Sequence, residues 1–174
     1  MNKKEKISFK GFIKRFPLID LPIILGNDTH HTFSNNNPPL PILYIDTFIS
    51  LIEGPIEQEF TEIIPCFSIP ETKDFHAIVY WKAGLMDYQY ILATYSKQGA
   101  PIARRVIGGT FSDGKVLVQS VATIDADWTI HIVTGNSKIQ EEEYDATTST
   151  AIEVELLADG NIVVEESPVG IRNK

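Results

Sequence analysis

The fold is decided by residues 74–134, which read DFHAIVYWKAGLMDYQYILATYSKQGAPIARRVIGGTFSDGKVLVQSVATIDADWTIHIVT. The stretch is rich in β-branched and aromatic side chains, which fit the pleated surface of a sheet. Gly84, Gly99 and Gly114 mark short turns within it, and no helix-length segment separates these turns. Because parallel strands need crossovers of about a dozen residues or more, this spacing predicts consecutive antiparallel strands. At residues 74–83 both faces of the expected strand are apolar, so both should be covered.

The predicted sheet extends beyond this stretch on both sides. Residues 61–69 form an apolar run of strand length that leads into it. After it, residues 150–157 alternate apolar side chains with glutamates, and a glycine turn leads to a last strand at residues 161–165. We therefore expect a mainly β fold, in which strands over residues 61–165 form an antiparallel meander that builds a sandwich or a barrel.

One helix is predicted, at residues 41–53. Isoleucines recur there at helical spacing and would share one stripe of the helix surface. These residues are Ile42, Ile45, Ile49 and Ile52. Pro41 suits a first helical turn, and Gly54 followed by Pro55 is a typical end. The isoleucine stripe should pack on the sheet or close one end of a barrel.

A chain of 174 residues, of which 43% are hydrophobic, is expected to form one domain. We assign this domain to residues 17–174 and expect residues 1–16 to be a basic N-terminal arm that need not be ordered. Two prolines within residues 16–25 favour an extended segment that lies along the sheet. Residues 26–39, which contain a run of asparagines and prolines, are expected to be a polar loop.

The charge is negative overall and unevenly distributed. The formal net charge is −8, with +5 on residues 1–16 and −7 on residues 139–174. A negative chain repels phosphate backbones, and the basic cluster lacks aromatic residues arranged for base stacking, so nucleic-acid binding is not expected. The charge favours instead a basic protein as the partner.

Composition also bears on the compartment. Lys10, Lys14 and Arg15 interrupt the apolar run that a signal peptide would need, and no run of about eighteen apolar residues predicts a membrane span. The single cysteine, Cys66, lies among apolar residues and is expected to be a buried thiol. Together these observations predict a cytoplasmic protein without a membrane-spanning segment.

Two groups of residues resemble metal ligands. Asp28, His30 and His31 have the side chains that zinc prefers, but adjacent histidines in an extended segment point in opposite directions, so a turn or packing role is favoured. Asp125 and Asp127 have carboxylates suited to calcium, but the glycine and the distal glutamate of an EF-hand loop are missing. A turn in which these side chains accept bonds from backbone amides is favoured. No cofactor is expected.

Arg104 and Arg105 lie in a predicted strand, so their side chains point to opposite faces. An unpaired charge inside a protein is costly, so the inward arginine must pair with a carboxylate or line a cavity. In the second case His76, Tyr80, Tyr88 and Tyr90 would supply the other polar groups of a ligand-binding pocket at a barrel mouth with Arg104. A surface arginine on a solvated face is the simpler alternative.

Catalytic motifs are absent from the sequence. It contains no nucleophile elbow, no phosphate loop and no paired-cysteine metal motif. Gly108 and Gly109 lie within a predicted strand rather than before a helix, which predicts a bulge or a close contact instead of a phosphate cradle. The sequence therefore gives no support to an enzyme.

Two hypotheses of function remain. The first is a small acidic protein-interaction module, of inhibitor or immunity type, in which Glu141, Glu142 and Glu143 form part of the surface that binds a basic partner. The second is a small-molecule-binding or enzymatic β-barrel, with the aromatic, histidine and arginine pocket considered above. A deep concave site with convergent polar groups would favour the second hypothesis, and a convex acidic face would favour the first.

Overall fold

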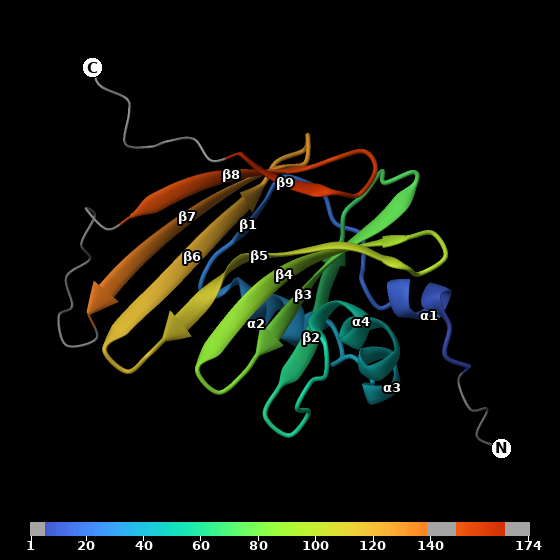
Figure 1. Ribbon diagram of the computed structural model, residues 1–174, viewed down its shortest axis with the longest axis horizontal. Coiled ribbons are helices and arrows are strands. Elements are labelled where there is room, and N and C mark those ends of the chain that lie inside the picture. Colours follow the sequence, from blue (N-terminus) through green and yellow to red (C-terminus); the bar gives the residue numbers. More distant parts are fainter. Residues whose placement is uncertain (1–5, 139–148, 166–174) are drawn as a thin grey trace.

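The computed structural model describes residues 6–138 and 149–165 and is mainly β (Figure 1). Its strands form one antiparallel sheet in chain order from β2 to β9, with β1 paired to β6, and the sheet is not closed into a barrel. This confirms the predicted antiparallel meander. The strands are β1 (Ile23–Leu25), β2 (Glu62–Ser68), β3 (Phe75–Ala83), β4 (Asp87–Ser96), β5 (Pro101–Ser112), β6 (Val116–Ile124), β7 (Thr129–Lys138), β8 (Thr150–Leu156) and β9 (Ile162–Glu165).

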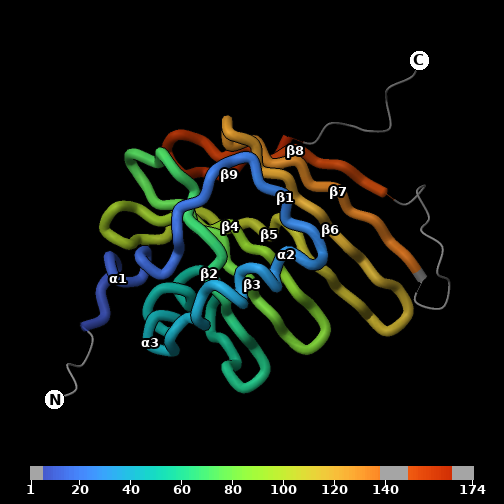
Figure 2. The backbone as a smooth tube through the Cα atoms, turned by 180° about the vertical axis from the view of Figure 1, so that it is seen from behind, coloured from blue at the N-terminus to red at the C-terminus, as the bar shows by residue number. Residues whose placement is uncertain are grey.

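The helices are short and cover both faces of the sheet. In Figure 1 the helical segment from α3 to α4 lies in front of the first strands, whereas Figure 2, seen from behind, shows β1 and α2 crossing the opposite face of the sheet. In the part of the chain that the structure describes, no helix has the length and apolar character needed to span a bilayer. The helices are α1 (Phe9–Ile13), α2 (Thr29–Asn36), α3 (Ile42–Tyr44), the π-helical turn η1 (Ile45–Ile49) and α4 (Ser50–Glu53).

Strand β5 curls the sheet into a sandwich-like shape. It pairs with β4 almost along its whole length, but with β6 only over its last residues, from Gly109 to Ser112. Where β5 departs, β1 takes its place beside β6, with Ile23 opposite Ile124. The strands before and after β5 therefore enclose a common core, and the predicted extended segment before residue 26 fills the gap between them.

Glycines at the bend of β5 make this curvature sterically possible. The register between β4 and β5 shifts by one residue next to Gly108, which is a β-bulge. Gly109 has φ of 133°, and a Cβ atom at this position would lie 1.9 Å from the carbonyl oxygen of Tyr88. This confirms the bulge and close contact predicted for the glycine pair, because only glycine allows such an approach.

Alternation along the strands separates two hydrophobic cores. On β3, Phe75, Val79 and Trp81 point into the core enclosed by the curled sheet. Ile78 and Tyr80 point to the other face, into a core covered by α1 and by the helix that precedes β2. The prediction that this strand is covered on both sides is confirmed. Cys66 is buried in the enclosed core, as expected, and its burial raises the pKa of the thiol.

The predicted helix at residues 41–53 is present, but its buried stripe differs from the expected one. Ile45 and Ile49 are buried in the outer core, whereas Ile42 is 58% exposed. The amide of Ser50 donates to the carbonyl of Ile45, a π-type hydrogen bond that places one extra residue in this turn. Tyr44, which does not belong to the isoleucine stripe, is buried in the outer core instead.

Two segments expected to be irregular contain helices. The predicted arm contains α1, whose residue Phe12 is buried in the outer core, so the chain is packed against the domain from this helix onward. The predicted loop at residues 26–39 contains α2. This helix is held by Phe33 in the enclosed core and by Asn37, whose Nδ2 donates to the carbonyls of Pro65 and Cys66 at 2.8 and 3.0 Å. These contacts are tertiary, which is why local sequence does not predict the helix.

Replacing Ile49 with alanine should lower the free energy of unfolding by roughly 2 to 5 kcal/mol, because the side chain is fully buried between helix and sheet. Ile42→Ala is the matched control, and its exposed side chain should cost less than about 0.5 kcal/mol. Urea unfolding of both variants measures the difference. Equal losses would show that Ile49 does not anchor the helix.

Replacing Gly109 with alanine should cost roughly 3 to 5 kcal/mol, because the new methyl group would collide with the backbone of Tyr88 at a strained φ. Gly114→Ala is the control, since Gly114 also has positive φ but has open space around it. That change should cost only about 1 to 2 kcal/mol. Similar losses in the two variants, measured by denaturant unfolding, would contradict the steric role of Gly109.

Candidate functional site

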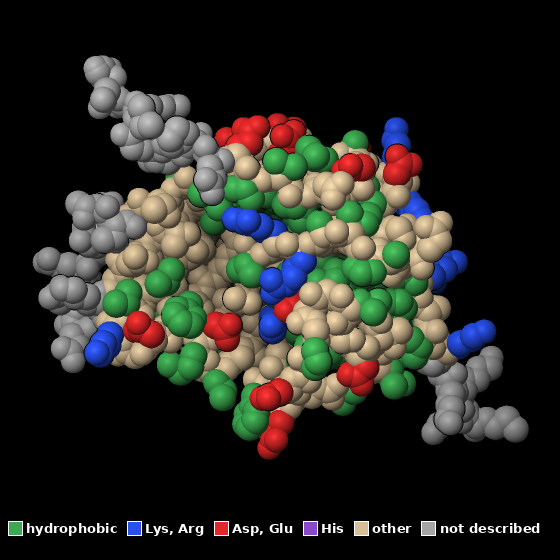
Figure 3. All heavy atoms as spheres, in the orientation of Figure 1, with side chains coloured by type: hydrophobic (Ala, Val, Ile, Leu, Met, Phe, Trp, Pro, Cys, Tyr) green, Lys and Arg blue, Asp and Glu red, His purple; other side chains and the backbone are tan. Residues whose placement is uncertain are grey.

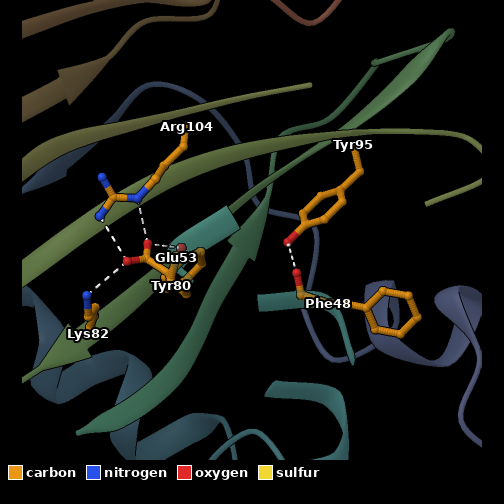
Figure 4. Close-up of polar contacts among 6 residues, drawn as sticks. All are labelled: Phe48, Glu53, Tyr80, Lys82, Tyr95 and Arg104. Atoms are coloured by element: carbon orange, nitrogen blue, oxygen red, sulfur yellow. Dashed lines mark hydrogen bonds and ion pairs between the residues drawn. The ribbon is translucent and has the colours of Figure 1, made fainter. Parts of the chain in front are cut away.

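The carboxylate of Glu53, at the end of α4, is the centre of a buried polar network (Figure 4). Its Oε1 accepts hydrogen bonds from Arg104 Nε at 2.6 Å and from the Tyr80 hydroxyl at 2.5 Å. Its Oε2 accepts from Lys82 Nζ at 2.9 Å and from Arg104 Nη2 at 3.0 Å. The side chain of Glu53 is only 2% exposed. The network joins the end of the helix to β3 and β5.

Near neutral pH the network keeps Glu53 ionised and Tyr80 protonated. Burial raises the pKa of the Glu53 carboxyl, but hydrogen bonds from Arg104, Tyr80 and Lys82 outweigh this effect, so the pKa lies below its usual value. Burial, and then the charge of Glu53, raise the pKa of Tyr80. A general acid or base needs a pKa near the working pH, so this arrangement is suited to fixing structure rather than to moving protons.

The sequence predicts that one of the two arginines pairs with a carboxylate or lines a cavity. In the structure Arg104 pairs with Glu53. Glu53 was not among the site residues predicted from the sequence. The sequence nevertheless indicates that Glu53 is buried, because it lies about one helical turn after Ile49 and so falls on the buried side of the helix.

Of the five residues considered for a ligand pocket, Tyr80 and Arg104 meet at Glu53, but the other three do not join them. Tyr88 and Tyr90 lie on the inner face of the curled sheet, where Tyr90 is opposite Trp81 and the rings of Trp81 and Tyr88 stack 5.8 Å apart. His76 and Arg104 lie on the outer face, His76 against α1 and Arg104 against α4. The sheet separates the two pairs, so they cannot line one site.

His30 and His31 lie in the first turn of α2 rather than on an extended segment, and Asp28 directly precedes this helix. The ring of His30 stacks on Trp81, with centroids 4.5 Å apart and planes 5° from parallel. Burial and then the neighbouring His31 lower the pKa of His30. Across residues 6–138 and 149–165, no three His, Cys, Asp or Glu side chains are grouped as metal ligands. The contacts observed for His30 are packing contacts.

The second acidic pair forms a turn. Asp127 Oδ1 accepts a hydrogen bond from the amide of Thr129 at 3.0 Å, as predicted for a turn residue. Asp125 uses its side chain differently, because its Oδ2 lies 2.9 Å from Nε2 of His131. Both carboxylates therefore have local partners.

A groove of about 560 Å³ lies between the start of the helical segment and the adjacent ends of β2 and β3. Its floor is apolar and buried, formed by Leu40, Ile45 and Ile63. Its rim carries exposed apolar side chains, notably Phe60, which is 48% exposed, and Leu85, which is 72% exposed. Exposed apolar side chains grouped around a concavity are typical of interaction sites.

Acidic groups surround this groove. Glu59 and Glu62 line it and are exposed, and the described residues of its lining include no lysine, arginine or histidine. Gln58, also in the lining, donates from Nε2 to Asp46 Oδ1 at 2.7 Å and so holds a further carboxylate nearby. Figure 3 shows acidic and hydrophobic side chains side by side at this lower edge of the molecule. We call this feature the acidic groove.

No protein-family model, no curated protein and no solved structure matches this chain. Evidence for function therefore comes from the surface of the molecule itself. In the Glu53 network, the carboxylate and both cations are held together within the fold. The acidic groove, in contrast, combines an open apolar surface with carboxylates that face solvent.

Replacing Glu53 with glutamine should lower the free energy of unfolding by roughly 2 kcal/mol near neutral pH, because charged hydrogen bonds to Arg104 and Lys82 are lost. Since the pKa of Glu53 is depressed in the folded protein, this stabilisation exists above the unfolded pKa of about 4.3 and disappears as the pH falls below it. The difference between wild type and variant should therefore close in acid. Urea unfolding over a pH series tests this, with the exposed Glu62→Gln as control. A difference that stays constant in acid would contradict the assignment.

Proposed function

We propose that this protein is an interaction module of inhibitor or immunity type that acts in the cytoplasm and binds a basic partner through the acidic groove. The observation that carries the proposal is the composition of the groove, which has an apolar floor, exposed apolar rim residues, and Glu59 and Glu62 without a basic residue among its described lining. The fitting occupant is a segment of another protein that presents Lys or Arg on either side of an apolar side chain.

The floor of the groove supports this proposal through its rigidity. Ile45 belongs to the helix that packs on the outer core, and Ile63 belongs to β2. The amide of Leu40 donates to the carbonyl of Ile63 at 3.2 Å, which fixes the chain that enters the helix. A preformed apolar floor lets an anchor residue bind without a large ordering cost.

The carboxylates support the choice of a basic partner. Glu57, Glu59 and Glu62 are exposed and close together in sequence, and the whole chain carries a net charge of −8. A field of one sign accelerates the encounter with an oppositely charged partner and disfavours acidic competitors. Apolar contacts would then hold the partner, so encounter and residence depend on different residues.

The acidic segment predicted from the sequence remains part of the proposal. Glu141, Glu142 and Glu143 lie outside the residues that the structure describes, so the groove is argued without them. We propose that their charge adds to the attraction of a basic partner. The ligand pocket of the alternative hypothesis has less support, because the sheet separates Tyr88 and Tyr90 from the other residues assigned to it.

Random displayed peptides selected on the purified protein should become enriched in Lys and Arg flanking an apolar residue. A variant with Glu59→Gln and Glu62→Gln should associate about tenfold more slowly with a selected peptide at low ionic strength. This difference should shrink as salt brings the Debye length below about 8 Å. Stopped-flow fluorescence with a labelled peptide measures both rates.

The matched control carries Glu153→Gln and Glu155→Gln, which remove the same charge from exposed positions on β8. It should associate at nearly the wild-type rate, whereas Leu85→Ser should mainly speed dissociation by removing an apolar contact. Selection of peptides without basic residues, or equal slowing in the groove variant and the control, would refute the acidic groove as the binding surface.

A further inference from the structure

A second hollow lies beside α1, at the end of β3 opposite the acidic groove. Its volume is about 400 Å³, and Figure 3 shows Lys and Arg side chains gathered along the edge of the molecule that carries α1. An adjoining hollow of about 430 Å³ shares Ile13, Lys14 and His76 with it. The residues that line the first hollow, which we call the basic hollow, are Phe9, Lys10, Ile13, Lys14, His76 and Lys97.

We propose that the basic hollow binds a phosphate monoester. Lys10, Lys14 and Lys97 would hold the phosphate group as positive charges around it. The apolar side chains of Phe9 and Ile13 would contact the organic part of the ligand. This ligand site is distinct from the acidic groove, and either can exist without the other.

The charge of the hollow runs against that of the whole protein. Among residues 6–138 and 149–165, no carboxylate belongs to the lining of the basic hollow, although Glu71 lines the adjoining one. Within the residues that the structure describes, none of the three lysines pairs with an acidic side chain. Three unneutralised lysines on a chain of net charge −8 are best matched by a dianion.

The fold positions these lysines before any ligand arrives. Phe12 is buried and its ring stacks on Phe48, with centroids 4.8 Å apart, which fixes α1 on the outer core. Lys10 and Lys14 are one helical turn apart and therefore lie on the same side of this segment. At Gly99, a Cβ atom would come within 3.0 Å of the Phe9 ring, so the turn that carries Lys97 packs closely on α1.

His76 forms the half-buried part of the hollow, with its ring 5.6 Å from that of Phe9. The charged and titratable groups that face it are the lysines of α1, Lys97 after β4, Glu71 before β3, and Tyr95, which is opposite it on β4 and donates to the carbonyl of Phe48. Burial, and then the charge of Lys97, lower the pKa of His76.

A bound dianion would oppose the charge of the lysines and raise the pKa of His76. Binding is then coupled to proton uptake by the imidazole, so affinity should increase as the pH falls toward the depressed pKa of His76 in the free protein. A phosphate group loses one of its own charges near pH 6, which works in the opposite direction. Sulfate keeps its charge over this range and therefore isolates the contribution of His76.

Isothermal titration calorimetry with inorganic phosphate and with phenyl phosphate tests the site and its ligand class. Both should bind saturably at low ionic strength, and phenyl phosphate should bind more tightly because of the apolar wall. Lys14→Gln and Lys97→Gln should each weaken binding about fivefold. The control Lys115→Gln changes an exposed lysine in the turn between β5 and β6 and should have no effect.

Nuclear magnetic resonance of the histidine rings provides a separate readout. The chain has four histidines, and only His76 should shift and gain a higher pKa when sulfate is added, while His131, which pairs with Asp125, stays unchanged. His76→Gln should bind sulfate without pH dependence. The proposed site would be overturned if the lysine variants bound like wild type or if Lys115→Gln weakened binding equally. An unchanged His76 signal would also overturn it. Equal affinity for inorganic phosphate and phenyl phosphate would overturn the assignment of a phosphate monoester as the ligand.

Discussion

The close approach of Gly109 to the carbonyl of Tyr88 is the constraint on which the rest of the structure depends. A side chain at this position would force β5 away from β4, and the bulge beside Gly108 turns the strand there. Because β5 turns, the strands on either side of it enclose a shared core instead of continuing as a flat sheet. The bend also exposes an edge of β6, which β1 covers. A single backbone contact thus determines both the enclosed core and the position of the N-terminal segment.

Burial of both faces of the first strands then determines where charge can lie. Charged or titratable groups meet the outer face where Glu53 contacts Arg104, where the acidic groove opens, and where His76 contacts α1. The last two lie at opposite ends of β3, which is roughly 25 to 30 Å long at about 3.3 Å per residue. This length exceeds the physiological Debye length of about 8 Å several times. The acidic groove and the basic hollow therefore attract opposite ions with little mutual cancellation.

Much of the fold follows from local pattern, because alternation and glycine turns in residues 61–165 depend on neighbouring residues alone. Helix α2 cannot be predicted from local pattern. Its stability comes from Phe33, which packs in the enclosed core, and from Asn37, which hydrogen-bonds to a distant strand. The site was harder to predict. Alternation assigns His76 and Tyr88 each to a face of its own strand, but whether the faces coincide depends on strand register across the turn. The need to pair an arginine could be predicted from its charge, whereas its partner lies on another element and emerges only from tertiary packing.

The pairing of β1 with β6 has a consequence for the order in which the chain can fold during its synthesis. Leu25 of β1 lies opposite Ala122, and the apolar residues of α1 and of the helical segment pack on strands that leave the ribosome after them. The first sixty or so residues therefore emerge with their aromatic side chains uncovered and without a surface on which to bury them. Such non-local pairs form slowly, because long loops must close, at a cost in entropy, before the stabilising contacts can be made. A nascent chain halted before β6 would be a substrate for chaperones rather than a half-built domain.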